Sequence, residues 1–133
     1  MAQYGEVAVL AVRLVRRGDV PSPVDAWHAA ARDRIQSSEG SRRKSCPRDA
    51  FLGLCEAGLV AGVPAGQYTR SRKNKTYALE VVRLLIRDAE RRSAGPRELW
   101  DDVMDGARNR PKGQMDVVLA LWTAGLIVRP TAA

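Results

Sequence analysis

The sequence predicts an all-α protein of about six helices in one compact domain spanning residues 1–133. Apolar residues recur at intervals of three and four along most of the chain, which is the spacing of a helix buried on one face. Pro residues precede several of these stretches and Gly residues follow them, as is usual at helix starts and ends. The hydrophobic content of 45% permits a core, and the aromatic content of 5% predicts a core made mainly of Ala, Val and Leu with Trp as the large filler.

The first three helices are predicted over residues 2–17, 23–36 and 47–57. Ser22 can cap the second helix, and a Pro follows at its first position, where no N–H is needed. Pro47 is expected to open the third helix in the same way, and Gly58 to end it in a left-handed conformation. Residues 37–45 are polar and basic without periodicity, which predicts a loop.

The last three helices are predicted over residues 75–91, 96–104 and 114–124. Residues 67–73 are expected to form a basic loop, with Asn74 capping the helix that follows. That helix is apolar on most of its circumference, which predicts a central position in the core. Residues 108–113 are expected to form another basic loop, and Gly125 should end the last helix.

Three segments recur in the same order, which predicts an internal duplication of two related three-helix halves, residues 4–66 and 74–130. The similar pairs are residues 11–15 and 81–85, 22–27 and 95–100, and 49–60 and 116–127. Each half would be too small to fold alone, so the two are expected to share one core. Chance is the alternative, because helices reuse Ala, Val and Leu. Unrelated environments for Trp27 and Trp100 would contradict the duplication.

The positive charge of the chain is concentrated in its middle. Residues 42–75 contain eight bases and two acids, which give +6 of the formal net charge of +7. A clustered basic surface attracts nucleic acid or another polyanion. The two basic loops, residues 42–48 and 70–75, flank the same short helix, so they are expected to converge on one face of the protein. Such a face would bind the phosphate groups of a nucleic acid without recognising its base sequence.

The candidate anion-binding residues are Arg42, Arg43, Lys44, Arg48, Tyr68, Thr69, Arg70, Arg72, Lys73 and Lys75. The bases would contact phosphate directly, and the hydroxyl groups can hydrogen-bond it. The sequence therefore favours a binding module without enzymatic activity, with nucleic acid as the expected partner. The alternative is a pair of solvated charged loops that bind nothing.

Two hypotheses from other functional classes remain open. The apolar Ala-Gly-Leu segments that end the third and sixth helices could form a homodimer. Cys46, just before a helix and beside two bases, could be a nucleophile of a thiol-dependent enzyme. His28, next to a Trp, is expected to be structural, and Cys55, among apolar neighbours, is expected to be core.

Nothing in the sequence predicts a metal ion or another cofactor. Cys46, Cys55 and His28 have no ligand spacing, and Asp101 and its acidic neighbours fit a solvated helix face. The two cysteines are too far apart along one helix for a disulfide and are expected to be reduced. The apolar run at residues 7–12 is too short for a secretion signal or a membrane span. We therefore expect a soluble, cytoplasmic protein with no membrane partner.

Two longer stretches of the sequence resemble known kinds of protein. Val118, Leu121 and the Gly-Leu-Ile of residues 125–127 resemble weakly the end of a winged-helix DNA-binding domain, although no strand pair for a wing follows. Residues 41–47, 50–56, 58–60, 62–69 and 113–122 resemble a family of small bacterial proteins of unknown function. The family resemblance would cover nearly the whole chain and implies no activity and no catalytic residue.

Overall fold

The computed structural model describes residues 3–36, 39–42, 44–104 and 113–128. Within these ranges the protein is all-α, as predicted. The helices are α1 (Gln3–Arg17), α2 (Pro23–Arg34), α3 (Glu39–Arg42), α4 (Ser45–Glu56), α5 (Arg72–Arg87), the 3-10 helix η1 (Ala89–Ser93), α6 (Pro96–Met104) and α7 (Gln114–Thr123). No helix in the described ranges has the length and apolar character that crossing a membrane requires.

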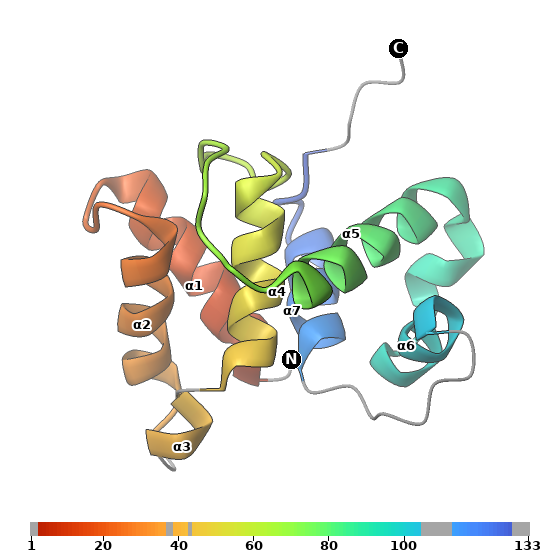
Figure 1. Ribbon diagram of the computed structural model, residues 1–133, viewed down its shortest axis with the longest axis horizontal. Helices are drawn as coiled ribbons and strands as arrows, with labels where there is room; N and C mark the ends of the chain where they lie inside the picture. The colour runs from red at the N-terminus through yellow and green to blue at the C-terminus, as the bar shows by residue number, and fades with distance from the viewer. Residues whose placement is uncertain (1–2, 37–38, 43, 105–112, 129–133) are drawn as a thin grey trace.

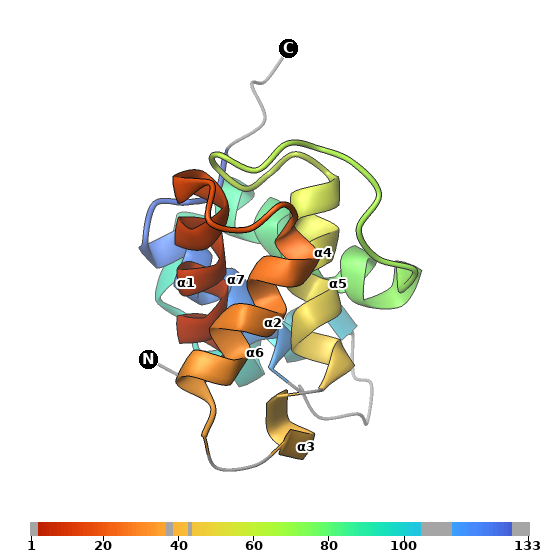
Figure 2. The same cartoon turned by 90° about the vertical axis from the view of Figure 1, so that its left-hand side faces the viewer.

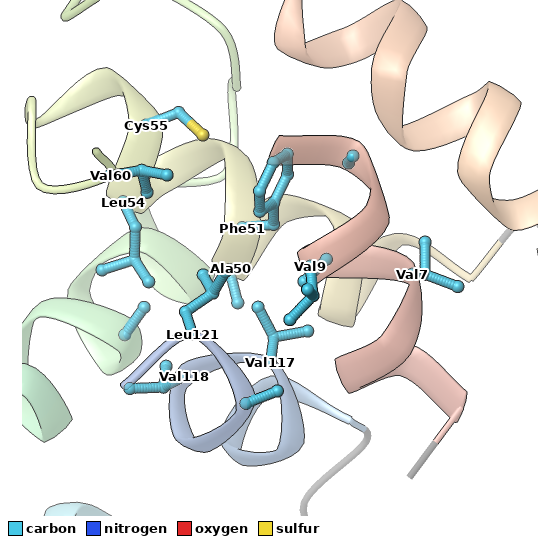
Figure 3. Close-up of a cluster of buried hydrophobic side chains, with 14 of the residues drawn as sticks. Val7, Val9, Ala50, Phe51, Leu54, Cys55, Val60, Val117, Val118 and Leu121 are labelled. Carbon is cyan, nitrogen blue, oxygen red and sulfur yellow. The ribbon is translucent and has the colours of Figure 1, made fainter. Parts of the chain in front are cut away.

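Helices α4 and α7 lie at the centre of the molecule, with α1 and α2 on one side and α5 and α6 on the other (Figure 1). Helix α1 packs against α2 and α7, whereas α5 packs mainly against α4. Figure 3 shows how side chains from α1, α4 and α7 point into one apolar cluster. Phe51, Leu54, Val117 and Leu121 are completely buried there.

The ends of α4 and α7 are joined by a single antiparallel bridge between Val60 and Ile127. The N–H of Ala61 donates to the carbonyl of Leu126 at 2.8 Å, and the N–H of Val128 donates to the carbonyl of Leu59 at 2.7 Å. This isolated bridge is the β-pairing found in the described residues, and they contain no strand. The described residues therefore lack the pair of strands that forms the wing of a winged-helix domain. The Ala-Gly-Leu ends thus pair with each other within the chain.

The predicted helix ends were right at the glycines and wrong at two starts. Residues 37–45 were predicted as a loop, but they contain α3 and the start of α4 at Ser45, two residues before Pro47. Pro47 is tolerated there because the N–H groups of a first helical turn have no partner within the helix.

Helix α5 begins at Arg72, earlier than predicted, and its cap is Ser71 rather than Asn74. The Ser71 hydroxyl accepts hydrogen bonds from the backbone N–H of Asn74 at 3.2 Å and from its side-chain amide at 3.1 Å. The bases from Arg72 to Lys75 therefore lie in the first turn of a helix and not in a loop. Helix α5 also ends earlier than predicted, at Arg87, and the sequence did not predict η1.

The duplication stays a prediction. Gly58 and Gly125 end α4 and α7 with φ angles of 77° and 73°. Trp27 and Trp100 are both buried against another aromatic ring. The rings differ in position, however, because Trp27 packs on Phe51 of α4 and Trp100 packs on Tyr77 of α5.

Candidate anion-binding grooves

Residues 66–71, which we call the strap, lead down the side of α4 to the start of α5 (Figure 2). A groove lies on either side of it. The α5 groove has a volume of about 690 Å³ and is lined by Glu56, the strap from residue 66 to 70, Arg72 and Lys75. The α2 groove has a volume of about 500 Å³ and is lined by Val24 and His28 of α2, Arg48, Asp49 and Leu52 of α4, and strap residues 68–71. Tyr68, Thr69 and Arg70 line both grooves.

Glu56, in the last turn of α4, fixes the upper part of the strap. One carboxylate oxygen accepts hydrogen bonds from the backbone N–H groups of Tyr68 at 2.9 Å and Thr69 at 3.4 Å. The other forms an ion pair with Lys75 Nζ at 2.6 Å. The bond from Lys75 and the bond from the Tyr68 N–H lower the pKa of Glu56 from 4.5 to about 2. Glu56 therefore stays ionised, and its negative charge neutralises the positive charge of Lys75 in the groove.

Asp49, two helical turns before Glu56 on the same face of α4, fixes the lower part of the strap. Its Oδ1 accepts a hydrogen bond from the Thr69 hydroxyl at 3.0 Å, and Arg48 Nε lies 3.4 Å from the same oxygen. The Thr69 hydroxyl in turn accepts the N–H of Ser71 at 3.1 Å. This chain of bonds connects α4 to the cap of α5, so the strap is held at both ends.

The buried amides of Asn74 and Gln114 continue the same polar chain to α7. Gln114 Nε2 donates to Asn74 Oδ1 at 3.1 Å, and both residues are buried. Because buried polar groups are costly without partners, these bonds favour one arrangement of α5 against α7.

Gly53 allows α4 and α5 to approach each other where the grooves are built. A Cβ atom at residue 53 would lie 2.7 Å from both Cα and Cβ of Lys75. The clash would be with backbone, which cannot rotate away. Gly53 therefore positions Lys75 beside Glu56.

The structure separates the ten predicted site residues into three groups. Tyr68, Thr69, Arg70, Arg72, Lys75 and Arg48 line one groove or both. Arg42, Lys44 and Lys73 line neither groove: Arg42 donates to the Ile35 carbonyl at the end of α2, Lys44 is exposed before α4, and the Lys73 ammonium lies 5.9 Å from the centre of the Tyr77 ring. Arg43 lies outside the described residues.

Among the described residues of the two basic segments, Arg48 and Arg70 share the α2 groove. The unpredicted α3 directs Arg42 back toward α2. Lys75 and Arg48 have acidic partners, whereas Arg70 and Arg72 are exposed and, among the residues that the structure describes, have no ion-pair partner. These two arginines give the grooves their uncompensated positive charge.

Sequence reasoning missed the two acids that hold the strap. Asp49 and Glu56 are the acids within the basic stretch, and their spacing of seven residues places them on one helix face. That spacing was the available signal. Gly53 in mid-helix was another, since such a glycine costs about 1 kcal/mol relative to Ala unless packing requires it.

The other two hypotheses stay predictions. Cys46 is a free, half-buried thiol, and no group of three or more potential metal ligands occurs in the described parts of the chain. Cys55 is buried, as predicted, and its burial raises the pKa of the thiol. The homodimer also stays a prediction: the Ala-Gly-Leu ends pair with each other through backbone bonds, and Val128 beside them is 44% exposed.

The comparison with protein families supports the predicted resemblance in its general form. Residues 1–128 match the model of DUF6979, a family of unknown function. The chain belongs to this family. No curated protein and no solved structure matches the chain. The family assignment brings no activity, so a proposal about function depends on the grooves.

Proposed function

We propose that the protein binds a polyanion, with nucleic acid as the expected partner, along the α5 groove. The observation that carries this proposal is the charge balance of the lining. Glu56 and Lys75 neutralise each other, which leaves Arg70 and Arg72 as uncompensated bases on an open groove. Arginine is well suited to phosphate because its planar group donates two parallel hydrogen bonds.

Two further features support the proposal. The positive end of the α5 dipole lies at Arg72, where it adds to the potential of the two arginines. The strap that carries Arg70 is fixed by Glu56 and Asp49, so little conformational entropy is lost on binding.

The test measures binding of a fluorescently labelled oligonucleotide by anisotropy over a range of salt concentrations. Each phosphate contact contributes about −0.9 to the slope of log K against log salt for duplex DNA and about −0.7 for a single strand. Replacing both Arg70→Ala and Arg72→Ala should weaken binding to all sequences equally and reduce the magnitude of that slope by about 2.

The matched control is Arg13→Ala with Arg17→Ala on α1. These arginines are exposed, line neither groove and change the net charge by the same amount. The control should retain the slope. Equal effects of the two double variants would mean that net charge and not the groove attracts the oligonucleotide, and absence of binding at low salt would contradict the proposal.

A further inference from the structure

The α2 groove differs in chemistry from the α5 groove. Its lining combines the apolar side chain of Val24, over the buried Leu52, with the cations Arg48 and Arg70 and the carboxylate of Asp49. Ligand pockets in proteins have volumes of roughly 300–1,000 Å³ and combine apolar walls with a few polar groups. At about 500 Å³ the α2 groove fits this description, and its lining suits a ligand that has an anionic group and an apolar, flat part.

The anionic end of such a ligand has two cations available. The Arg48 side chain is 30% exposed, and its contact with Asp49 is a long one of 3.4 Å through Nε. Asp49 is also occupied by the Thr69 hydroxyl. Because a guanidinium has five donors, Arg48 keeps donors for a phosphate, and the exposed Arg70 supplies more from the strap.

The flat part can contact Tyr68, a half-buried residue of the α2 groove lining whose side chain is held in place. The Tyr68 hydroxyl donates to the carbonyl of Pro64 at 2.7 Å, and its backbone N–H is bound by Glu56. The ring also lies close to Gly66, where a Cβ atom would come within 3.0 Å of it. An aromatic ring held in this way can stack on any nucleobase.

We propose that the α2 groove binds one nucleotide unit, with its phosphate at Arg48 and Arg70 and its base against Val24 and Tyr68. The proposal rests on the proposed function and extends it, because Arg70 and the strap connect the two grooves into one path. Bases in a duplex are stacked and paired, so the α2 groove would make the protein prefer single strands. The nucleotide could belong to a strand or be free in solution.

The test compares four labelled or competing ligands on the wild-type protein: a single strand, the same strand without bases, the matching duplex, and adenosine monophosphate as competitor. We expect the strand with bases to bind about tenfold more tightly than the abasic strand, since one base stacks on the protein. His28→Glu, which adds a carboxylate to the α2 groove alone, should remove this difference. Arg72→Ala, which affects the α5 groove alone, should weaken binding of both strands by the same factor.

The outcomes separate the two proposals. Equal binding of the strands with and without bases would overturn the nucleotide site and leave the polyanion proposal standing. Binding of adenosine monophosphate measured directly by calorimetry, without binding of any strand, would overturn the polyanion proposal, and its loss in His28→Glu would assign the free nucleotide to the α2 groove. Absence of binding by all four ligands would overturn both. Circular dichroism of each variant shows whether it is folded. The comparison of strands with and without bases uses the wild-type protein, so it does not depend on the folding of any variant.

Discussion

Glu56 is one acidic side chain in a basic stretch, and its position explains how the strap can be both charged and ordered. Its carboxylate accepts two backbone N–H groups of the strap and the ammonium of Lys75. Only 9% of the side chain is exposed, so these partners replace most of its water. The carboxyl group of Glu56 therefore ionises more readily in the folded protein than in the unfolded chain.

The pH dependence of stability should show this preference. Because the folded pKa of about 2 lies below the ordinary 4.5, Glu56 stabilises the fold fully above about pH 4.5. This contribution declines as the pH falls from 4.5 toward 2, where the folded state also takes up the proton. Urea unfolding of the wild type and of Glu56→Gln should therefore differ most at neutral pH and converge at acidic pH.

Glu80→Gln is the control for this comparison. Glu80 forms an exposed pair with Arg83 at 3.4 Å, and its side chain is 50% exposed. Exposed pairs contribute about 0–1 kcal/mol, so this variant should differ little from the wild type at any pH. A difference between wild type and Glu56→Gln that did not change with pH would rule out the ion pair as its cause.

Gly53 gives the second prediction at this scale. Ala is the better helix former by about 1 kcal/mol, yet Gly53→Ala should lower the free energy of unfolding by about 1–3 kcal/mol. The new methyl group would meet the backbone of Lys75 at 2.7 Å and push α5 away from α4. Gly40→Ala in α3 is the matched control, since nothing lies within 4 Å of its Cβ position. Both are measured by urea unfolding, and equal stability of the two variants would contradict the close approach.

At the scale of elements, the ends of α4 and α7 have the same local geometry. The Leu59 N–H donates to the Leu54 carbonyl at 3.0 Å, and the Leu126 N–H donates to the Leu121 carbonyl at 2.9 Å. Gly58 and Gly125 make these ends possible because both have positive φ angles. The two ends then pair through the Val60–Ile127 bridge, which fixes α4 against α7.

Substitutions at these two glycines should therefore have matching effects. Gly58→Ala and Gly125→Ala should each destabilise the protein by about 1 kcal/mol, the cost of a left-handed alanine. Asn at either position should cost less, because its side chain tolerates that conformation. Thermal unfolding of the four variants tests the prediction, and a large difference between the two alanine variants would contradict the equivalence of the two helix ends.

The sequence predicted these helix ends because capping depends on residues a few positions apart. It did not predict the strap's attachments, since the Thr69–Asp49 bond spans 20 residues and the Gln114–Asn74 bond spans 40. For the same reason the sequence shows where the charged residues are but does not predict which of them form ion pairs. From the sequence, Arg70 and Arg72 are candidate anion-binding residues in the same way as Arg42 and Lys75. The fold shows that Arg42 already donates to a backbone carbonyl and that Lys75 already forms an ion pair with Glu56.

At the scale of the whole molecule, the N-terminal and C-terminal helices interlock. Helix α1 packs against α7 from the far end of the chain, and α5 packs against α4. The apolar cluster of Figure 3 accordingly takes side chains from both residues 4–66 and residues 74–130. Neither segment therefore has a complete core of its own, whether or not the two arose by duplication.

This packing predicts that the chain unfolds as one cooperative unit. Leu121→Ala, which removes a fully buried side chain of α7, should lower the free energy of unfolding by about 2–5 kcal/mol. Because α7 contacts α1, α4 and α5, hydrogen exchange at buried Val12 of α1 and Leu85 of α5 should accelerate by the same factor. Leu119→Ala, at a half-buried position on the same helix, should accelerate both amides less. If protection were lost in α5 and α6 but kept in α1 and α2, the two segments would unfold separately, and the shared core would not be the main source of stability.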